Sequence, residues 1–189
     1  SKLSGNYNLV ITISKTDKDL LTTFKSDIGS GHKISEVKPS VFNGCISKPK
    51  VSISISSKAL YKSLKKLGVS ECKSLKLTVP NIKKEYYPSF IRGYFDGDGS
   101  IFSYKNKGRI VYRCNIVGST EFMKWMKSIL PIDVRLYKEK RCNGMYYINI
   151  QTKKSLEKFY EYLYSKPGYK LKRKFDKYSE FIHNIKRAP

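Results

Sequence analysis

Residues 86–102 read YYPSFIRGYFDGDGSIF, and the rest of the chain is organised around this stretch. Pro88 predicts the first turn of a helix, because that position needs no donating N–H and proline already has a helical φ. Gly93 lies on the apolar face of this helix and leaves room for another backbone to approach. The side chains of that face recur at helical spacing: Phe90, Ile91, Tyr94 and Phe95.

Two acids end this helix. We expect it to stop close to Asp96, because Gly97 and Gly99 are poor helix formers and residues 100–102 resemble the start of a strand. Negative charge at a helix C-terminus opposes the helix dipole by about 0.3–1 kcal/mol. No neighbour in the sequence offsets this cost for Asp96 or Asp98, and such a local conflict is typical of a functional site.

Basic residues greatly outnumber acidic ones. The 189 residues include 38 Lys and Arg against 15 Asp and Glu, which gives a formal net charge of +23. That excess favours a polyanionic partner, most simply nucleic acid, and a membrane surface is the weaker alternative. The apolar content of 40% is enough for a packed core. No apolar run approaches a membrane span and no signal-peptide pattern follows Ser1, so we expect a protein that is neither membrane-embedded nor secreted.

The cysteines and histidines are isolated. Without a C-x-x-C pair or neighbouring histidines there is no local pattern for zinc, and we expect reduced, mostly buried thiols at Cys45, Cys72, Cys114 and Cys142. His32 and His183 stand alone, so a mechanism driven by histidine is not expected.

The chain contains an approximate internal duplication. Residues 8–14 and 50–56 alternate between apolar and polar side chains, as half-buried strands do, and each is followed by a helix, capped by Thr16 and by Ser57. The same order returns after residue 86. Its elements are strands at 109–116 and 145–151, a helix capped by Ser119 and a helix at 152–164. Further strands are predicted at 32–37 and 133–141, and a loop at 39–49.

The duplication predicts an α+β fold of two pseudo-symmetric αββαββα units with antiparallel sheets. The first unit, residues 1–80, lacks its initial helix and strand, about 25 residues by comparison with the second. The second unit covers residues 81–169. Residues 170–189 form a basic C-terminal helix docked on the surface. Its polar face is expected to carry Lys172, Arg173, Lys174 and Lys177.

The stretch IRGYFDGDG, residues 91–99, resembles the motif of the LAGLIDADG homing endonucleases, and Gly93, Asp96, Asp98 and Gly99 are identical to it. Together with the repeat and the charge, the resemblance covers residues 8–177. It is to the second motif of a single-chain, two-repeat member, especially of the phage and intron type. A location in the cytoplasm of a phage or bacterial host, or in an organellar matrix, would follow.

This resemblance implies a saddle of antiparallel strands in the DNA major groove, with two motif helices at its centre. It also implies cleavage of both strands of a long specific site with Mg²⁺ as cofactor. Asp98 would be the catalytic acid, Asp98 and Gly99 would form the metal site, and Asp96 would hold the turn or the helix interface. A glycine-flanked carboxylate can coordinate a hard cation, but only weakly by itself. An EF-hand interpretation fails, because Ile101 replaces the required glycine.

The outward faces of the strands are expected to read DNA, since Arg suits guanine edges and Asn or Gln suits adenine. In the second unit these residues are Tyr104, Asn106, Arg109, Arg113, Asn115, Arg135, Tyr137, Arg141, Asn149 and Gln151, with Lys153 just beyond. In the first unit they are smaller and more neutral: Asn8, Thr12, Lys33, Ser35, Ser52 and Ser54. Family members often place a catalytic lysine near the last strand of each unit. Here Ser56 and Gln151 stand at those positions, with Lys58 and Lys153 two residues later.

The leading hypothesis is therefore a site-specific, metal-dependent DNA endonuclease. Because the chain carries one motif acid, a complete centre requires a second from a preceding N-terminal segment or from another chain. The alternative is a catalytically inactive relative that binds nucleic acid, as an RNA maturase or as an accessory subunit of a nucleic-acid machine. A generic basic protein, such as a ribosome component, explains the charge but neither the motif nor the duplication.

Overall fold

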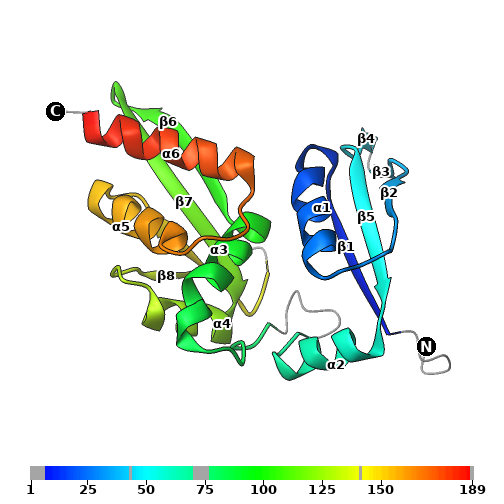
Figure 1. Cartoon of the computed structure of the whole chain (residues 1–189). Helices are drawn as coiled ribbons and strands as arrows, with labels where there is room; N and C mark the ends of the chain where they lie inside the picture. Colours follow the sequence, from blue (N-terminus) through cyan, green and yellow to red (C-terminus); the bar gives the residue numbers. More distant parts are fainter. Residues whose placement is uncertain (1–6, 43, 70–76, 141, 188–189) are drawn as a thin grey trace. The chain divides into compact units, whose positions relative to one another are not determined.

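The computed structural model describes residues 7–42, 44–69, 77–140 and 142–187. Its contacts divide the chain into two compact units, Ser1–Lys66 and Leu67–Pro189 (Figure 1). The division lies before residue 80, where the sequence repeat is expected to end, and the C-terminal helix belongs to the second unit. Each unit has its own hydrophobic core.

The first unit is a small antiparallel sheet in the order β1-β5-β2. Strands β1 (Asn8–Ser14) and β5 (Lys50–Ser56) have the predicted bounds, and β2 covers Ile34–Val37. Helices α1 (Lys18–Asp27) and α2 (Lys58–Lys66) follow β1 and β5. The alternation in β5 turns one face of the sheet into the core, whose buried members are Leu21, Val51, Ile53 and Ile55.

Two local predictions in this unit are wrong. The expected loop at 39–49 contains a short hairpin of β3 (Val41–Phe42) and β4 (Cys45–Ile46). Pairing of the two strands satisfies their backbone N–H and C=O groups, and the flanking prolines lie outside the paired residues. Thr16 does not cap α1. It lies in a 3₁₀ turn, η1 (Lys15–Asp17), and Asp17 takes the N-cap position, where its side chain makes no capping hydrogen bond to α1.

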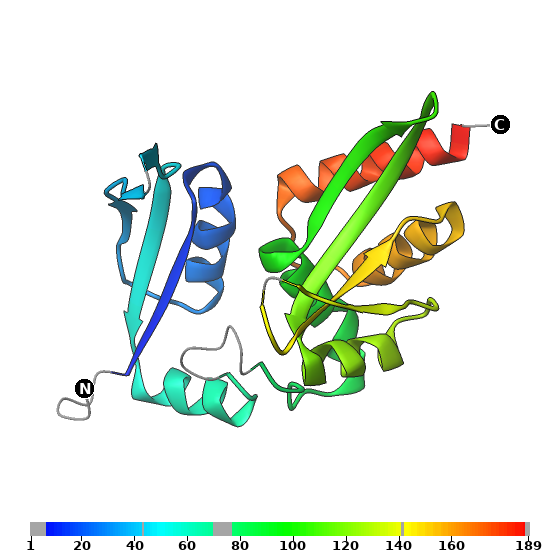
Figure 2. The same ribbon diagram turned by 180° about the vertical axis from the view of Figure 1, so that it is seen from behind.

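The second unit begins with the 3₁₀ turn η3 (Lys84–Tyr86) and helix α3 (Tyr87–Asp98). Strands β6 (Ser100–Asn106), β7 (Arg109–Ser119), β9 (Met145–Ile150) and β8 (Leu136–Lys138) form an antiparallel sheet in the order β6-β7-β9-β8. Helices α4 (Thr120–Ile129), α5 (Lys153–Tyr164) and α6 (Lys172–Arg187) join α3 on one face of it. Seen from behind, the sheet lies in front of these helices, and its other face carries no helix of this unit (Figure 2).

The strand orders confirm the incomplete duplication. In each unit the strand before a helix pairs with the strand before the next helix, so β1 corresponds to β7 and β5 to β9, while β2 corresponds to β8. In the second unit β7 also pairs along its length with β6. Among the described residues of the first unit, β1 has no such neighbour, and no helix corresponds to α3. The described part of the first unit therefore has no counterpart of the initial helix and strand of the second, in agreement with the predicted fold.

Helix α3 ends at Asp98, close to the predicted end, so both acids of the motif lie at its C-terminus as expected. The second unit corrects two predictions. The strand expected at 133–141 is reduced to β8, since only its middle pairs with β9. Lys174 is buried rather than exposed on the polar face of α6.

The three described cysteines are free, and among them only Cys114 is buried; Cys45 is exposed and Cys142 is half-buried. Cys72 lies outside the described residues. Burial raises the pKa of the Cys114 thiol to about 12. Among the described residues, no helix is both long and apolar enough to cross a membrane.

The two faces of the first sheet can be compared by matched truncations. Ile53 is fully buried in β5, so Ile53→Ala is expected to lower the free energy of unfolding by about 3 kcal/mol. Val10 is 59% exposed on the opposite face, and Val10→Ala should change it by less than about 0.5 kcal/mol. Urea unfolding followed by circular dichroism measures both. Equal effects would contradict the assignment of the buried face.

Candidate nucleic-acid interface and its carboxylate

Asp98 is the last residue of α3, and its side chain is exposed. Tyr94, one turn earlier, donates its hydroxyl to the carbonyl oxygen of Val117 on β7 at 2.7 Å. Burial, and to a smaller extent the negative charge of Asp98, raises the pKa of Tyr94 to about 12. The carboxylate of Asp98 therefore lies near the point where the end of α3 meets the sheet.

Gly99 caps α3, and no other residue fits there. A Cβ at this position would lie 2.3 Å from Cδ2 of Phe95, which is fully buried. The Gly99 N–H donates to the Phe95 carbonyl at 2.9 Å, and the Gly99 carbonyl accepts from Nζ of Lys174 at 2.5 Å. That carbonyl therefore already faces a cation, so Asp98 is the better placed of the two predicted metal ligands.

Asp96 has a structural environment that differs from that of Asp98. It is buried, and its Oδ2 accepts from the backbone N–H of Leu171, just before α6, at 2.9 Å. Burial raises the pKa of Asp96, although the Leu171 N–H and the nearby Lys174 and Arg92 act in the opposite direction. Asp96 thus joins α3 to the start of α6, in keeping with its expected role in holding the helix interface.

Arg113 is the centre of a polar cluster on the uncovered face of the sheet. Its NH2 group donates to the Tyr104 hydroxyl and to Oε1 of Gln151, each at 2.8 Å. Its guanidinium carbon also lies 5.1 Å from the centre of the Tyr104 ring and 6.0 Å from that of Phe102. The structure therefore brings three predicted DNA-binding residues, from β6, β7 and the end of β9, into one contact set.

Asn115 and Asn149 lie opposite each other in the β7–β9 pairing. Together with Arg113 they line a groove of about 500 Å³, which is also lined by Ser100, two residues after Asp98. The Oδ1 atoms of both asparagines are buried without a hydrogen-bond partner among the described residues. Unpaired amide groups in a groove are suited to a ligand that supplies the missing hydrogen bonds.

Several residues of this surface escape prediction from the sequence. Tyr137 is exposed, in keeping with its predicted role, but the ring on which it stacks, Tyr147, is not among the predicted residues; the two ring centres are 5.3 Å apart. Lys138 and Lys140 also line the groove. The strand register carries the signal for Tyr147, because its neighbour Asn149 lies on the same face, two residues on.

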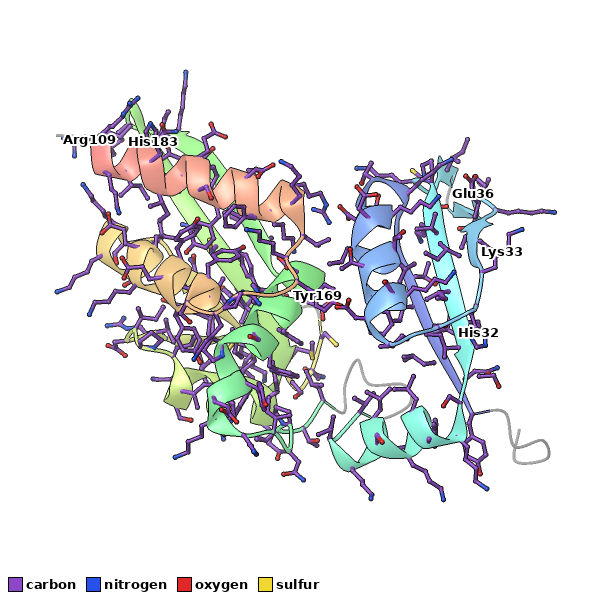
Figure 3. All side chains as sticks on the ribbon, viewed as in Figure 1. His32, Lys33, Glu36, Arg109, Tyr169 and His183 are labelled. Carbon is purple, nitrogen blue, oxygen red and sulfur yellow. The ribbon has the colours of Figure 1, made fainter. Side chains whose placement is uncertain are left out.

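The remaining predicted residues lie further from the groove. Asn106 pairs with Arg109 beside the turn that joins β6 to β7, and Arg109 is labelled in Figure 3. Arg109 and Lys153 line a separate cavity of about 890 Å³ beside α5 and α6. Arg135 is exposed but precedes β8, and Arg141 lies outside the described residues.

The first unit has a smaller polar surface. Asn8, Thr12, Ser52 and Ser54 lie on the face of the sheet opposite the core, and the Thr12 and Ser52 hydroxyls are 2.9 Å apart. Ser35 pairs with Ser52, and Lys33 lies just before β2 (Figure 3). Glu36 forms an exposed ion pair with Lys15 at 2.6 Å, which lowers the pKa of Glu36.

A complete metal site within the chain would need several acidic, histidine or cysteine side chains together. Among the described residues, no cluster of three such side chains could hold a metal ion. Mg²⁺ is commonly bound by one or two carboxylates together with phosphates of the substrate. The exposed Asp98 carboxylate fits that use, as one ligand of a cation shared with another molecule.

Comparison with protein families gives a match over residues 85–164 to the LAGLIDADG-like domain. This part of the chain is similar to that family. The match includes the Asp98 helix and the sheet on which the polar groove lies. A comparison by sequence with curated proteins found no match.

The fold is that of the LAGLIDADG homing endonucleases. A structure of I-SmaMI bound to cleaved DNA aligns with a TM-score of 0.63 and 15% identity, over 94% of this chain and 77% of that one. I-SmaMI bound to uncleavable DNA with a TTGT central four aligns with a TM-score of 0.65 and 16% identity, over the same shares. I-SmaMI bound to an uncleaved target with calcium ions gives 0.61 and 16%, over 95% and 80%.

The proximity of Asp98 to Tyr94 can be tested without a ligand. Asp98→Asn removes the negative charge and is expected to lower the pKa of Tyr94 below about 12, yet keep it above the ordinary 10.0, since burial is the larger cause. ¹³Cζ NMR of tyrosine measures it. Because the folded pKa is raised, the associated stability is present below pH 10 and lost as the pH rises towards 12.

In Asp98→Asn the loss of stability as the pH rises from 10 towards 12 should be smaller than in the wild type. Asp133→Asn serves as the control, because Asp133 is exposed and remote in sequence from Tyr94. An unchanged pKa of Tyr94 in Asp98→Asn would contradict the placement of the carboxylate.

Proposed function

We propose that this protein is a site-specific endonuclease that hydrolyses both strands of a long DNA site with a divalent metal, Mg²⁺ in the first instance. The observation that carries this proposal is the exposed Asp98 carboxylate at the end of α3, two residues before Ser100, which lines the polar groove on the uncovered sheet face. Both lie within the residues that match the LAGLIDADG-like domain. I-SmaMI, whose fold is similar, has been captured with cleaved DNA.

The uncovered sheet face supplies the DNA contacts. Arg113 is held by Tyr104 and Gln151, so little side-chain entropy is lost when it binds. Asn115 and Asn149 have unpaired amide oxygens side by side, and asparagine can pair with the major-groove edge of adenine. The net charge of +23 supplies the sequence-independent attraction to phosphate.

Asp98 would hold the metal together with DNA phosphate oxygens. The ion, when bound, supplies an activated water and stabilises the leaving oxygen of the phosphodiester. The side chains of this unit do the rest: the carboxylate fixes one coordination position at the end of a rigid helix, and the groove residues orient the duplex against it.

We further propose that a second carboxylate comes from outside the described residues. A helix and strand equivalent to α3 and β6 would complete the first unit by pairing with β1, and either a segment preceding residue 7 or another chain could provide them. Gly93 and Gly97 leave one exposed side of α3 bare, since a Cβ added at either position would have no atom within 4 Å among the described residues. A second motif helix could approach α3 closely there.

Cleavage tests the proposal directly. A preferred duplex is first selected from a random double-stranded library without metal and is then incubated with Mg²⁺ and the protein, with any preceding coding segment included. Asp98→Asn is expected to reduce cleavage by about 100-fold or more, because it removes a metal ligand. Binding should be kept or strengthened, since a negative charge facing phosphate is lost.

Asp133→Asn is the matched control and should cleave normally. Undiminished cleavage by Asp98→Asn would refute the assignment of the carboxylate, and selective binding without any metal-dependent cleavage would favour a binding protein.

A second candidate function rests on the aromatic residues of the same face. Phe102 and Tyr104 lie near Arg113, and Tyr137 stacks on Tyr147. Tyr104 and Tyr137 are exposed, and Phe102 and Tyr147 are half-buried beside them. Aromatic rings on an open sheet face with a cation among them are suited to stacking unpaired bases. A catalytically inactive relative that binds RNA, as a maturase or an accessory subunit, would use them in this way.

Tyr147→Leu separates the two functions. If bases stack on this surface, the variant is expected to lose about 1–3 kcal/mol of affinity for a single-stranded RNA, while affinity for the selected duplex changes little. Val117→Leu, on the same face and in register with Tyr147, controls for a general disturbance of the groove. Fluorescence anisotropy at fixed salt measures both ligands. Unchanged RNA binding would leave the endonuclease as the better supported function.

A further inference from the structure

Lys174 is a buried cation that the proposed chemistry does not use. Its side chain is 7% exposed, although it lies in the basic first turns of α6, where the neighbouring Lys172 and Arg173 are exposed. Lysine is rarely buried unless its ammonium has partners. Here the ammonium of Lys174 has three carbonyl oxygens as partners.

The ammonium meets the end of α3. Nζ donates to the carbonyl oxygens of Phe95 and Asp96, each at 2.7 Å, and to that of Gly99 at 2.5 Å. These acceptors lie on both sides of Asp98 in the sequence. The last carbonyls of a helix have no partner within it, and positive charge there is favoured by the helix dipole. Lys174 thus supplies from α6 the positive charge that the last turn of α3 lacks in its own sequence.

Two further buried contacts hold α6 in place to do this. Asp96 accepts from the N–H of Leu171, and Arg92 donates from NH1 to the carbonyl of Lys166 at 2.6 Å and from NH2 to that of Pro167 at 3.2 Å. The α5–α6 connection, where Tyr169 is labelled in Figure 3, is therefore fastened to α3 at both ends. Gly168 has φ +132°, and a Cβ there would lie 2.7 Å from NH2 of Arg92, so the connection is shaped to admit that guanidinium.

We propose that Lys174 is a positioning residue for Asp98. By holding the carbonyls before and after Asp98, the ammonium fixes the backbone from which the carboxylate projects and prevents the last helical turn, with its Gly97 and Gly99, from fraying. The inference rests on the proposed function in one respect, the role of Asp98 as a metal ligand; the fixing of the helix end is independent of it.

The first test is amide hydrogen exchange in the full chain. In Lys174→Met, the Gly99 amide, which donates to the Phe95 carbonyl, is expected to exchange at least about 10-fold faster relative to the Ile148 amide in the centre of the sheet. Normalising to Ile148 removes the global loss of stability. Lys172→Met is the matched control, since the exposed Lys172 pairs only with Asp176 one turn on, and it should leave the ratio unchanged. An unchanged ratio in Lys174→Met would overturn the inference.

If Lys174→Met does not fold, the wild-type protein still decides the matter. The ammonium protons of Lys174, shielded and hydrogen-bonded, are expected to be visible in ¹H–¹⁵N spectra at neutral pH, whereas those of Lys172 exchange too fast. Absence of the Lys174 signal would also overturn the inference.

The second test uses Mn²⁺ as a probe of Asp98. Broadening of the Gly99 and Ser100 amides by Mn²⁺ is expected in the wild type, to be lost in Asp98→Asn and to need at least about 5-fold more Mn²⁺ in Lys174→Met. Equal Mn²⁺ affinity in Lys174→Met and the wild type would overturn the positioning role. No Asp98-dependent broadening in the wild type would instead refute the metal site of the proposed function, and the exchange ratio would then decide the role of Lys174 alone.

Discussion

The ammonium of Lys174 against the last carbonyls of α3 is the interaction on which the candidate site depends. A helix that ends in acids and glycines is unfavourable by itself, because the dipole repels the acids and glycine favours the unfolded chain. The buried ammonium of Lys174 places positive charge at the C-terminal end of the helix dipole. It also donates hydrogen bonds to carbonyl oxygens of the last turn. Burying charge is costly, and the structure offsets the cost by giving Lys174 and Arg92 backbone carbonyls as acceptors and placing Asp96 between them.

These contacts also explain how the two acids of the motif come to differ. Asp96 faces α6, where burial raises its pKa and the Leu171 N–H holds its Oδ2. Asp98 is two residues on, about 200° around the helix, and so faces away from α6 into solvent. One acid therefore supports the fold and the other is exposed, although each is followed by a glycine in the sequence.

The two units of the duplication differ in how their sheets are paired and in the size of their cores. In the second unit β7 is paired on both sides, and its core runs under the whole sheet. In the first unit β1 is an edge strand among the described residues, and the core is much smaller. An unpaired strand edge can pair with a further strand. A segment that completed the first sheet in this way would also supply the helix that we propose to carry the second carboxylate. I-SmaMI has a similar fold, with a TM-score of 0.63, at only 15% sequence identity.

The elements that could be predicted from the residues alone are those whose pattern is local: β1 and β5, the Ser119 cap that accepts from the Phe122 N–H, the repeat with its missing part, and the exposed acid at the end of a helix. Periodicity and capping act over a few residues, so they can be read from the chain. The partner of α3 could not, because Lys174 lies more than 70 residues away and looks like one basic residue among many. Packing in three dimensions decided that Lys174 is buried, that Arg113 meets Tyr104 and Gln151, and that Asn115 faces Asn149. These contacts depend on strand register and helix packing, which bring together residues that no local pattern connects.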